Sequence, residues 1–247
     1  MSPHLPYCGL PPSPGELLAR FNLDPLLIGA LVLLAAAHVV LGRTRRERGL
    51  AIAGWVVAAI AFISPLCALS VALFSARIAQ HMILMLAAAP LIALALPRGS
   101  RASGSGLLYG SAAFFFVALW FWHMPGPYDS TFVATPIYWS MHVTLFGSAI
   151  VLWRELLQHR CERTAAVLSV GAFTSMQMGF LGAVLALAAR PMFSWHFLTA
   201  HTWGLTALQD QQLGGTLMWV PGAALFLWAA LRSLERMWHA LDDAKTV

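Results

Sequence analysis

The chain has 247 residues, of which 59% are hydrophobic and only 10% are charged. A soluble domain has about 45–50% apolar and about 25% charged residues, so this composition excludes an ordinary water-soluble protein and predicts an integral membrane protein. The formal net charge is +5, but the chain has no soluble domain on which the basic residues could form a nucleic-acid-binding face. Nucleic acid is therefore excluded as a partner.

Apolar runs of about 17 to 25 residues, long enough to cross a bilayer as helices, occupy most of the chain. Before the first run, residues 1–25 lack the basic start and apolar centre of a cleaved signal, so we interpret them as an extracytoplasmic tail stiffened by proline. The runs predict an all-α bundle of seven transmembrane helices over residues 26–231 and a cytoplasmic tail over 232–247. The seven expected spans are 26–42, 50–73, 76–96, 106–123, 136–153, 164–189 and 212–231.

The positions of the basic residues predict how the bundle is oriented. Short loops on the cytoplasmic side of a membrane protein are enriched in Lys and Arg. Seven spans place twelve basic residues at one end of the bundle and only Arg20, Arg77 and Arg190 at the other, so we expect the N-terminus outside and the C-terminus in the cytoplasm. The cytoplasmic set is Arg43, Arg45, Arg46, Arg48, Arg98, Arg101, Arg154, Arg160, Arg163, Arg232, Arg236 and Lys245.

Three histidines fall near the outer ends of three different spans: His81 in the third, His123 at the end of the fourth and His142 in the fifth. A helical rise of 1.5 Å per residue places His81 and His142 each about 9 Å along its helix, so the two can face each other at similar depth. Ionisable side chains at membrane depth usually mark functional sites, although a histidine that only bonds a neighbouring helix is the alternative. Of the other histidines, we expect His4, His196 and His201 outside, and we interpret His38, His159 and His239 as structural or solvated residues on the cytoplasmic side.

Methionine and cysteine side chains share the outer half with these histidines. Imidazole, thioether and thiol groups together suit Cu(I), whereas hard cations prefer carboxylate oxygens, which are few on this side. Methionine is also a common filler of apolar interiors, so packing is the alternative for each Met. The cysteines form neither a C-x-x-C motif nor a disulfide framework, although Cys8 and Cys67 could meet outside, and Cys161 is expected to be an inert thiol. The candidate copper ligands are His81, His123, His142, Met82, Met124, Met141 and Cys8.

Three segments of the chain resemble the signatures of the CtaG-type assembly factors of cytochrome c oxidase, a family named for caa-type oxidases. They are QHMILMLAAAPLIAL (80–94), WHMPGPYD (122–129) followed by MH (141–142), and DQQLGGTLMWVPG (210–222). The resemblance implies a seven-helix protein of the bacterial inner membrane that takes part in copper-dependent maturation of the oxidase. It also implies transiently bound Cu(I) and oxidase subunits as partners, and it leaves room for another copper chaperone. The matching positions that it makes functional are His81, His123, His142, Asp210, Gln211 and Gln212, and Asp129 is a further candidate functional residue.

The chain departs from the commoner family pattern at two places. Many relatives have His-Met four residues before the His-Met of the third span, where this chain has Arg77 at the first position. Many also have His-x-x-Glu-His in the fifth span, where this chain has Tyr138, Met141 and His142. With two imidazoles missing, either groups such as Met141 and Cys8 complete the site, or it binds copper weakly, or it binds none.

Other functions make different demands on the same residues. A retinal protein needs a lysine within a span for its Schiff base, and the sole lysine is Lys245 in the tail. A membrane haem protein could use His81 and His142 as axial ligands, and this alternative stays open. No nucleophile and base are paired in a recognisable motif, so we do not expect an enzyme. Asp210 could also simply cap the start of the seventh span.

Overall fold

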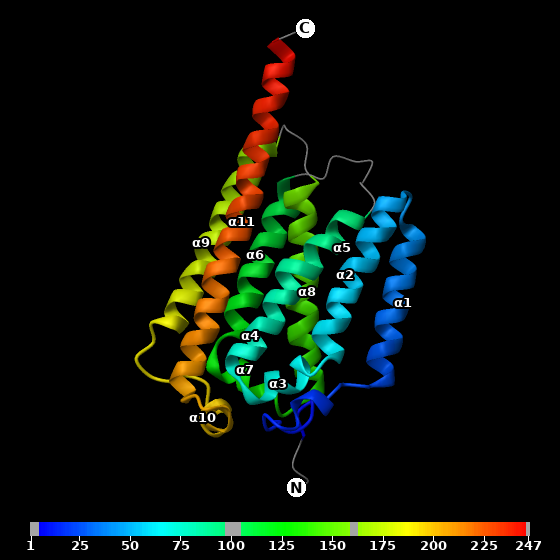
Figure 1. The fold of residues 1–247 in the computed structure, drawn as a ribbon. Coiled ribbons are helices and arrows are strands. Elements are labelled where there is room, and N and C mark those ends of the chain that lie inside the picture. The colour runs from blue at the N-terminus through cyan, green and yellow to red at the C-terminus, as the bar shows by residue number, and fades with distance from the viewer. Residues whose placement is uncertain (1–4, 97–104, 159–162, 246–247) are drawn as a thin grey trace.

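The computed structural model describes residues 5–96, 105–158 and 163–245, and every regular element within these ranges is a helix (Figure 1). The prediction of an all-α membrane protein is therefore confirmed. The long helices lie side by side, and short helices gather at one end of the bundle. The elements are η1 (Leu17–Ala19), α1 (Pro25–Leu41), α2 (Arg45–Ile63), α3 (Leu66–Ala72), α4 (Phe74–Met82), the π-helical segment η2 (Ile83–Ala88), α5 (Ala89–Ala95), α6 (Ser105–Trp122), α7 (Pro125–Ser130), α8 (Thr135–Leu157), α9 (Thr164–Ala186), α10 (His196–Thr199), η4 (Ala200–Trp203) and α11 (Ala207–Lys245).

Length and hydropathy identify the helices that can cross a membrane. Among the described residues, three segments are long and apolar enough: Phe74–Ala95, Thr164–Ala186 and Ala207–Glu235. A fourth candidate is the pair α2 and α3, which together form a span bent by 47°. Two further helices, α1 and α6, are apolar but shorter. The count of seven spans therefore stays a prediction.

The second expected span, 50–73, is wrong as a single straight helix. α2 ends at Ile63, and Ser64 takes an extended conformation before Pro65. A residue that precedes proline is disfavoured in the helical region, which explains the break. The Ser64 hydroxyl oxygen then accepts a hydrogen bond from the Leu66 amide at the start of α3. α3 lies across the end of the bundle, near the N-terminal segment (Figure 1).

The two ends of the bundle differ in what they carry. The N-terminal segment lies at the same end as α3, α7 and α10, whereas the connection between α1 and α2 lies at the end from which α11 projects to the C-terminus (Figure 1). We call the first of these the outer end, after its predicted side, and which end faces the cytoplasm stays a prediction. His4, Arg98, Arg101, His159, Arg160 and Cys161 lie outside the described residues, as do the side chains of Arg236, His239 and Lys245.

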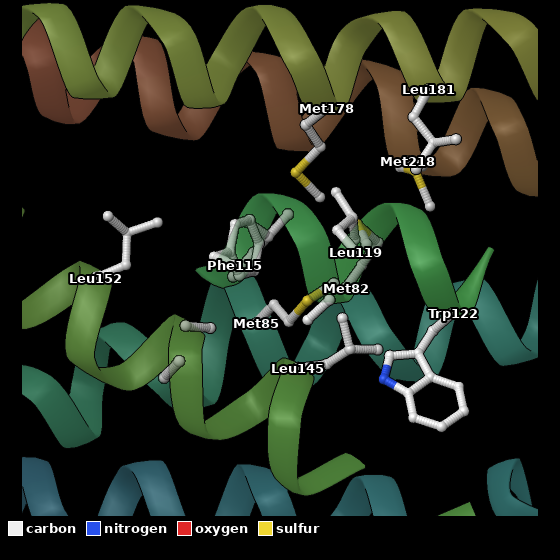
Figure 2. Packing of buried hydrophobic residues seen from close by; sticks show 14 of the residues in the cluster. Met82, Met85, Phe115, Leu119, Trp122, Leu145, Leu152, Met178, Leu181 and Met218 are labelled. Carbon is white, nitrogen blue, oxygen red and sulfur yellow. The ribbon is translucent and has the colours of Figure 1, made fainter. Parts of the chain in front are cut away.

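α9 and α11 approach each other closely because glycine lies at their contact. A Cβ atom at Gly215 would lie 2.4 Å from the backbone nitrogen of Ala186, and one at Gly182 would lie 2.8 Å from that of Trp219. Small residues allow this approach of helix backbones in membrane proteins. The rest of the core is filled by leucine, aromatic and methionine side chains (Figure 2).

The last helix is longer than the expected span 212–231. The Thr206 hydroxyl oxygen accepts a hydrogen bond from the Gln209 amide, and the Gln209 side-chain oxygen accepts one from the Thr206 amide. This reciprocal cap begins α11 at Ala207. The helix continues past Pro221 to Lys245, so most of the expected C-terminal tail is helical.

Candidate metal site

Three helices bring three histidines together near the outer end of the bundle. His81 lies near the end of α4, His123 directly follows α6, and His142 lies in α8. The ring centres of His81 and His123 are 5.8 Å apart, and those of His81 and His142 are 5.3 Å apart. All three side chains are buried. The fold thus places side by side the three histidines that the sequence analysis assigns to one site.

The ring nitrogens of these histidines are only partly satisfied. The Nδ1 atoms of His123 and His142 lie 2.6 Å and 3.0 Å from the carbonyl oxygens of Leu119 and Tyr138, one helical turn back. Each Nδ1 therefore donates its proton to a carbonyl, which leaves Nε2 with a free lone pair. Within the described residues, both Nε2 atoms and both nitrogens of His81 have no hydrogen-bond partner. An unsatisfied buried polar atom costs about 1–3 kcal/mol, so binding a ligand here would relieve a real penalty.

The three rings do not close around a metal in this arrangement. Within the described residues, no group of three His, Cys, Asp or Glu side chains could hold a metal ion as it stands. The planes of the His123 and His142 rings cross that of His81 at 79° and 72°. A metal–imidazole bond is about 2 Å long, so ligation requires the rings to turn their free nitrogens toward one point.

A buried arginine and a tyrosine flank the histidines on the outer side. Arg77 lies in α4, one turn before His81, and is 1% exposed. Its guanidinium carbon is 4.5 Å from the ring centre of Phe132 and 5.3 Å from that of Tyr138. The Tyr138 ring in turn lies 4.3 Å from the ring of His142. In the sequence, Arg77 stands where many relatives have a histidine, and a charged residue within an apolar stretch is itself a signal of a site.

The candidate thioethers differ in where they lie. Met82 and Met141 are buried in the main apolar core, and Figure 2 shows Met82 and Met85 among leucines and Phe115. Met124 is 51% exposed at the start of α7, so it faces the surface rather than the buried rings. These positions give Met82 and Met141 a packing role, and copper ligation by any of the three candidate methionines stays a prediction.

Cys8 and Cys67 form a disulfide that ties the N-terminal segment to α3, with Cα atoms 5.4 Å apart. The sequence shows no disulfide framework, yet the fold joins the one pair that could meet outside. The Tyr138 hydroxyl lies 3.5 Å from the Cys8 sulfur and 3.9 Å from the Cys67 sulfur. In this oxidised form Cys8 has no thiolate to offer a metal, so its predicted role as a ligand requires reduction.

Asp210 joins two helices at the outer end. Its fully buried carboxylate accepts hydrogen bonds from the Phe74 amide at 2.6 Å, the Ser75 amide at 3.0 Å and the Ser75 hydroxyl at 2.5 Å. These are the first amides of α4, so Asp210 on α11 caps a different helix from its own. The alternative that Asp210 caps its own span is wrong, because Thr206 occupies that position.

The other polar candidates hold connecting segments at the outer end. Gln211 and Gln212 bond to the backbone at the end of α9 and in the segment that follows it. Asp129 accepts a hydrogen bond from the Ser194 hydroxyl at 2.5 Å. These contacts give all three residues a structural role, and a direct functional role for them stays a prediction.

His196, a further buried histidine, has partners for both of its ring nitrogens. Its Nε2 lies 2.9 Å from the Tyr128 hydroxyl, and its Nδ1 lies 3.2 Å from the Ala72 carbonyl oxygen. The neutral ring satisfies both contacts, because Nδ1 donates to the carbonyl while Nε2 accepts from the tyrosine. Burial lowers the pKa of His196 to about 3, which keeps the ring neutral. His196 is therefore a structural residue, whereas His201 is exposed.

Comparison with known families decides the class of the protein. The sequence model of the cytochrome c oxidase caa3 assembly factor family (Caa3_CtaG) matches residues 28–104 and 110–240. The chain belongs to this family. The match includes the three clustered histidines, Asp210 and Cys67, whereas Cys8 precedes it. No curated protein and no solved structure matches the chain.

Membership in the Caa3_CtaG family assigns the chain a role in the assembly of cytochrome c oxidase. This confirms the coarse function that the signature segments predict. It also indicates that the oxidase is a partner, and that the role of this membrane protein is a non-catalytic one.

Proposed function

We propose that this Caa3_CtaG protein binds Cu(I) transiently through His81, His123 and His142. It passes the copper to a haem-copper oxidase at the outer face of the bacterial inner membrane. The observation that carries this proposal is the meeting of three buried imidazoles, from three helices, with Nε2 atoms that have no partner among the described residues. In a neutral histidine, the lone pair on such an Nε2 atom can bind a metal ion.

The ligands at this end of the bundle favour copper over a hard cation. Imidazole nitrogen and sulfur suit Cu(I), whereas calcium, magnesium and manganese require several carboxylate oxygens. The buried carboxylate of Asp210 already accepts three hydrogen bonds at the start of α4. It is therefore committed to the fold and does not serve a metal.

An incomplete set of ligands suits transfer. Structural metal sites are closed by four protein ligands, whereas sites that exchange a ligand keep one position open. Three imidazoles leave a position for a group from the copper donor or from the oxidase. Met82 and Met141, which neighbour His81 and His142 in sequence, are thioethers that can join the site if the helices shift.

The haem alternative makes His81 and His142 axial ligands of one iron. A porphyrin would have to lie between rings whose centres are 5.3 Å apart and whose planes cross at 72°. Tyr138 and Phe62 also pack against His142, with ring centres at 4.3 Å and 5.1 Å. This packing favours a single ion over a macrocycle. A reduced-minus-oxidised spectrum of the purified protein with haem bands would reverse this preference.

Copper analysis of the anaerobically purified protein, with and without added Cu(I), tests the proposal. We expect bound copper in the unaltered protein and loss of most of it in His81→Gln and His142→Gln. His201→Gln is the matched control, because His201 is exposed and should change nothing. Thermal unfolding of each variant in detergent shows whether it is folded. Equal copper retention in all folded variants would remove the histidine site.

A deletion strain tests the role in the cell. We expect lower oxidase activity because the copper centre of the oxidase is left incomplete, and partial restoration by added copper. The oxidase should be purified from the strain and its copper and haem content measured. An oxidase with normal activity and normal copper would contradict copper delivery.

A further inference from the structure

The Cys8–Cys67 disulfide is connected to the histidine cluster by one side chain, that of Tyr138. The Tyr138 hydroxyl is within 3.5 Å and 3.9 Å of the two sulfurs, and the Tyr138 ring is 4.3 Å from the ring of His142. His142 in turn lies beside His81. A continuous row of side chains therefore leads from the sulfurs at the outer end to the buried imidazoles.

The disulfide also holds the N-terminal segment over this row. Tyr7, the residue before Cys8, stacks on Tyr138 with ring centres 4.8 Å apart and meets the edge of Trp139 at 5.0 Å. The Tyr7 hydroxyl donates a hydrogen bond to Asp24 at the start of α1. Because Cys67 lies in α3, the covalent bond joins the N-terminal segment to the bundle, and its cleavage would leave only the non-covalent contacts of this segment.

The two sulfurs differ in ways that favour exchange at one of them. Cys8 is half-buried and accessible, whereas Cys67 is fully buried. The side-chain amide of Asn22 donates to the Cys67 sulfur at 3.6 Å. Thiol–disulfide exchange proceeds fastest when the attacked sulfur is accessible and the leaving thiolate is stabilised. These differences favour attack of an external thiolate on Cys8, with Cys67 as the leaving group.

We propose that Cys8 and Cys67 are a redox-active pair which, once reduced, binds Cu(I) as two thiolates and supplies it to the histidine cluster. A dithiol protein of the outer compartment is the reductant. One of its thiolates bonds to the Cys8 sulfur, the disulfide breaks, and the electron pair and then a proton go to Cys67. The second thiol of the reductant then attacks the mixed disulfide and releases Cys8 as a thiol. The reductant is thereby oxidised to a disulfide. Binding of Cu(I) then releases two protons without any change in the copper oxidation state.

The charge of Arg77 explains why thiolates suit this position. The guanidinium is buried at 5.3 Å from the ring of Tyr138, whose hydroxyl touches both sulfurs. Because charges interact strongly where water is excluded, the positive charge of the buried Arg77 stabilises thiolates near it. Two thiolates with Cu(I) carry a net charge of −1, which Arg77 balances. Thiolate is also the softest ligand for Cu(I) that a protein offers.

This inference rests on the proposed function, because the thiolates supply copper to the same histidines. The test uses the full chain in detergent under anaerobic conditions, in a Cys161→Ser background that removes the third thiol. Cu(I) alone is titrated against a chromogenic Cu(I) chelator after mild reduction or oxidation of the protein. We expect reduction to raise the Cu(I) affinity by about tenfold or more, the scale on which supporting groups alter metal affinity. X-ray absorption should show thiolate ligands in the reduced form only.

Two single variants, Cys8→Ser and Cys67→Ser, should each abolish the increase in affinity on reduction. Equal affinity and nitrogen-only ligation in the reduced and oxidised unaltered protein would overturn the inference while leaving the histidine site intact. Resistance of the disulfide to a dithiol reductant in the folded protein would overturn it as well. Sulfur-bound copper that persists in His81→Gln and His142→Gln supports the thiolate pair and speaks against copper retention by the histidines, so the two failures are distinguishable.

Discussion

The cap that Asp210 forms on α4 yields a prediction about stability that can be worked out from its contacts. Asp210→Ala leaves the Phe74 amide, the Ser75 amide and the Ser75 hydroxyl without their acceptor. Both residues are almost fully buried, so water does not replace the carboxylate. At about 1–3 kcal/mol for each of the three unsatisfied donors, the variant should lose roughly 3–9 kcal/mol of unfolding free energy. Asp210→Asn keeps one acceptor oxygen and should lose about 1–2 kcal/mol, as for a weakened helix cap.

Thermal unfolding in detergent tests whether Asp210→Ala is less stable than Asp210→Asn. For chains of this size, about 1 kcal/mol shifts the midpoint by roughly 2–4 °C, so Asp210→Ala should melt at least roughly 6 °C lower than the unaltered protein. Gln212→Ala is the control on the same helix, because it removes one part-buried hydrogen bond worth about 0.5–1.5 kcal/mol. An Asp210→Ala midpoint equal to that of Gln212→Ala would refute the capping argument.

Three further predictions concern orientation, pH and helix packing. After mild reduction of spheroplasts, a membrane-impermeant thiol reagent should label Cys8 and spare Cys161, and the reverse pattern would invert the predicted orientation. The pKa of His196 is about 3 in the folded protein but near 6.5 in the unfolded chain. The free energy of unfolding should therefore decrease as the pH is lowered from about 6.5 to about 3. His196→Gln should flatten this slope, measured by thermal unfolding between pH 7 and pH 4. Gly215→Ala should lose about 1–3 kcal/mol, because the new Cβ meets the α9 backbone, whereas Gly110→Ala meets nothing within 4 Å; equal melting midpoints would contradict this.

The positions of the helices could be read from the sequence to a useful degree, because hydrophobic length is a local property. The expected spans 76–96, 106–123 and 136–153 all correspond to continuous helical segments in the structure. The predicted helix boundaries are wrong where a side chain constrains the backbone or forms hydrogen bonds with it. Pro65 ends the second helix early, and the cap between Thr206 and Gln209 starts the last helix five residues sooner than expected.

The candidate site was only partly predictable. The depths of His81 and His142 follow from the helical rise and the span boundaries, so their proximity could be inferred. Nothing in the sequence showed that Arg77 lies over Tyr138, or that Tyr138 touches both sulfurs. Such contacts depend on how helices rotate and cross, which no local pattern encodes.

By itself, the sequence determined that this is a helical membrane protein of an oxidase assembly family with imidazole and sulfur groups at one end. Composition, the length of the apolar runs and the signature segments depend only on residues that are close in sequence. They are therefore the same however the helices pack. The tertiary structure decided the pairing of Cys8 with Cys67, 59 residues apart, and the capping of Ser75 by Asp210, 135 residues apart. The physical reason is that partners this far apart are selected by packing. In a buried interior, each polar group must find its partner on whichever helix lies next to it.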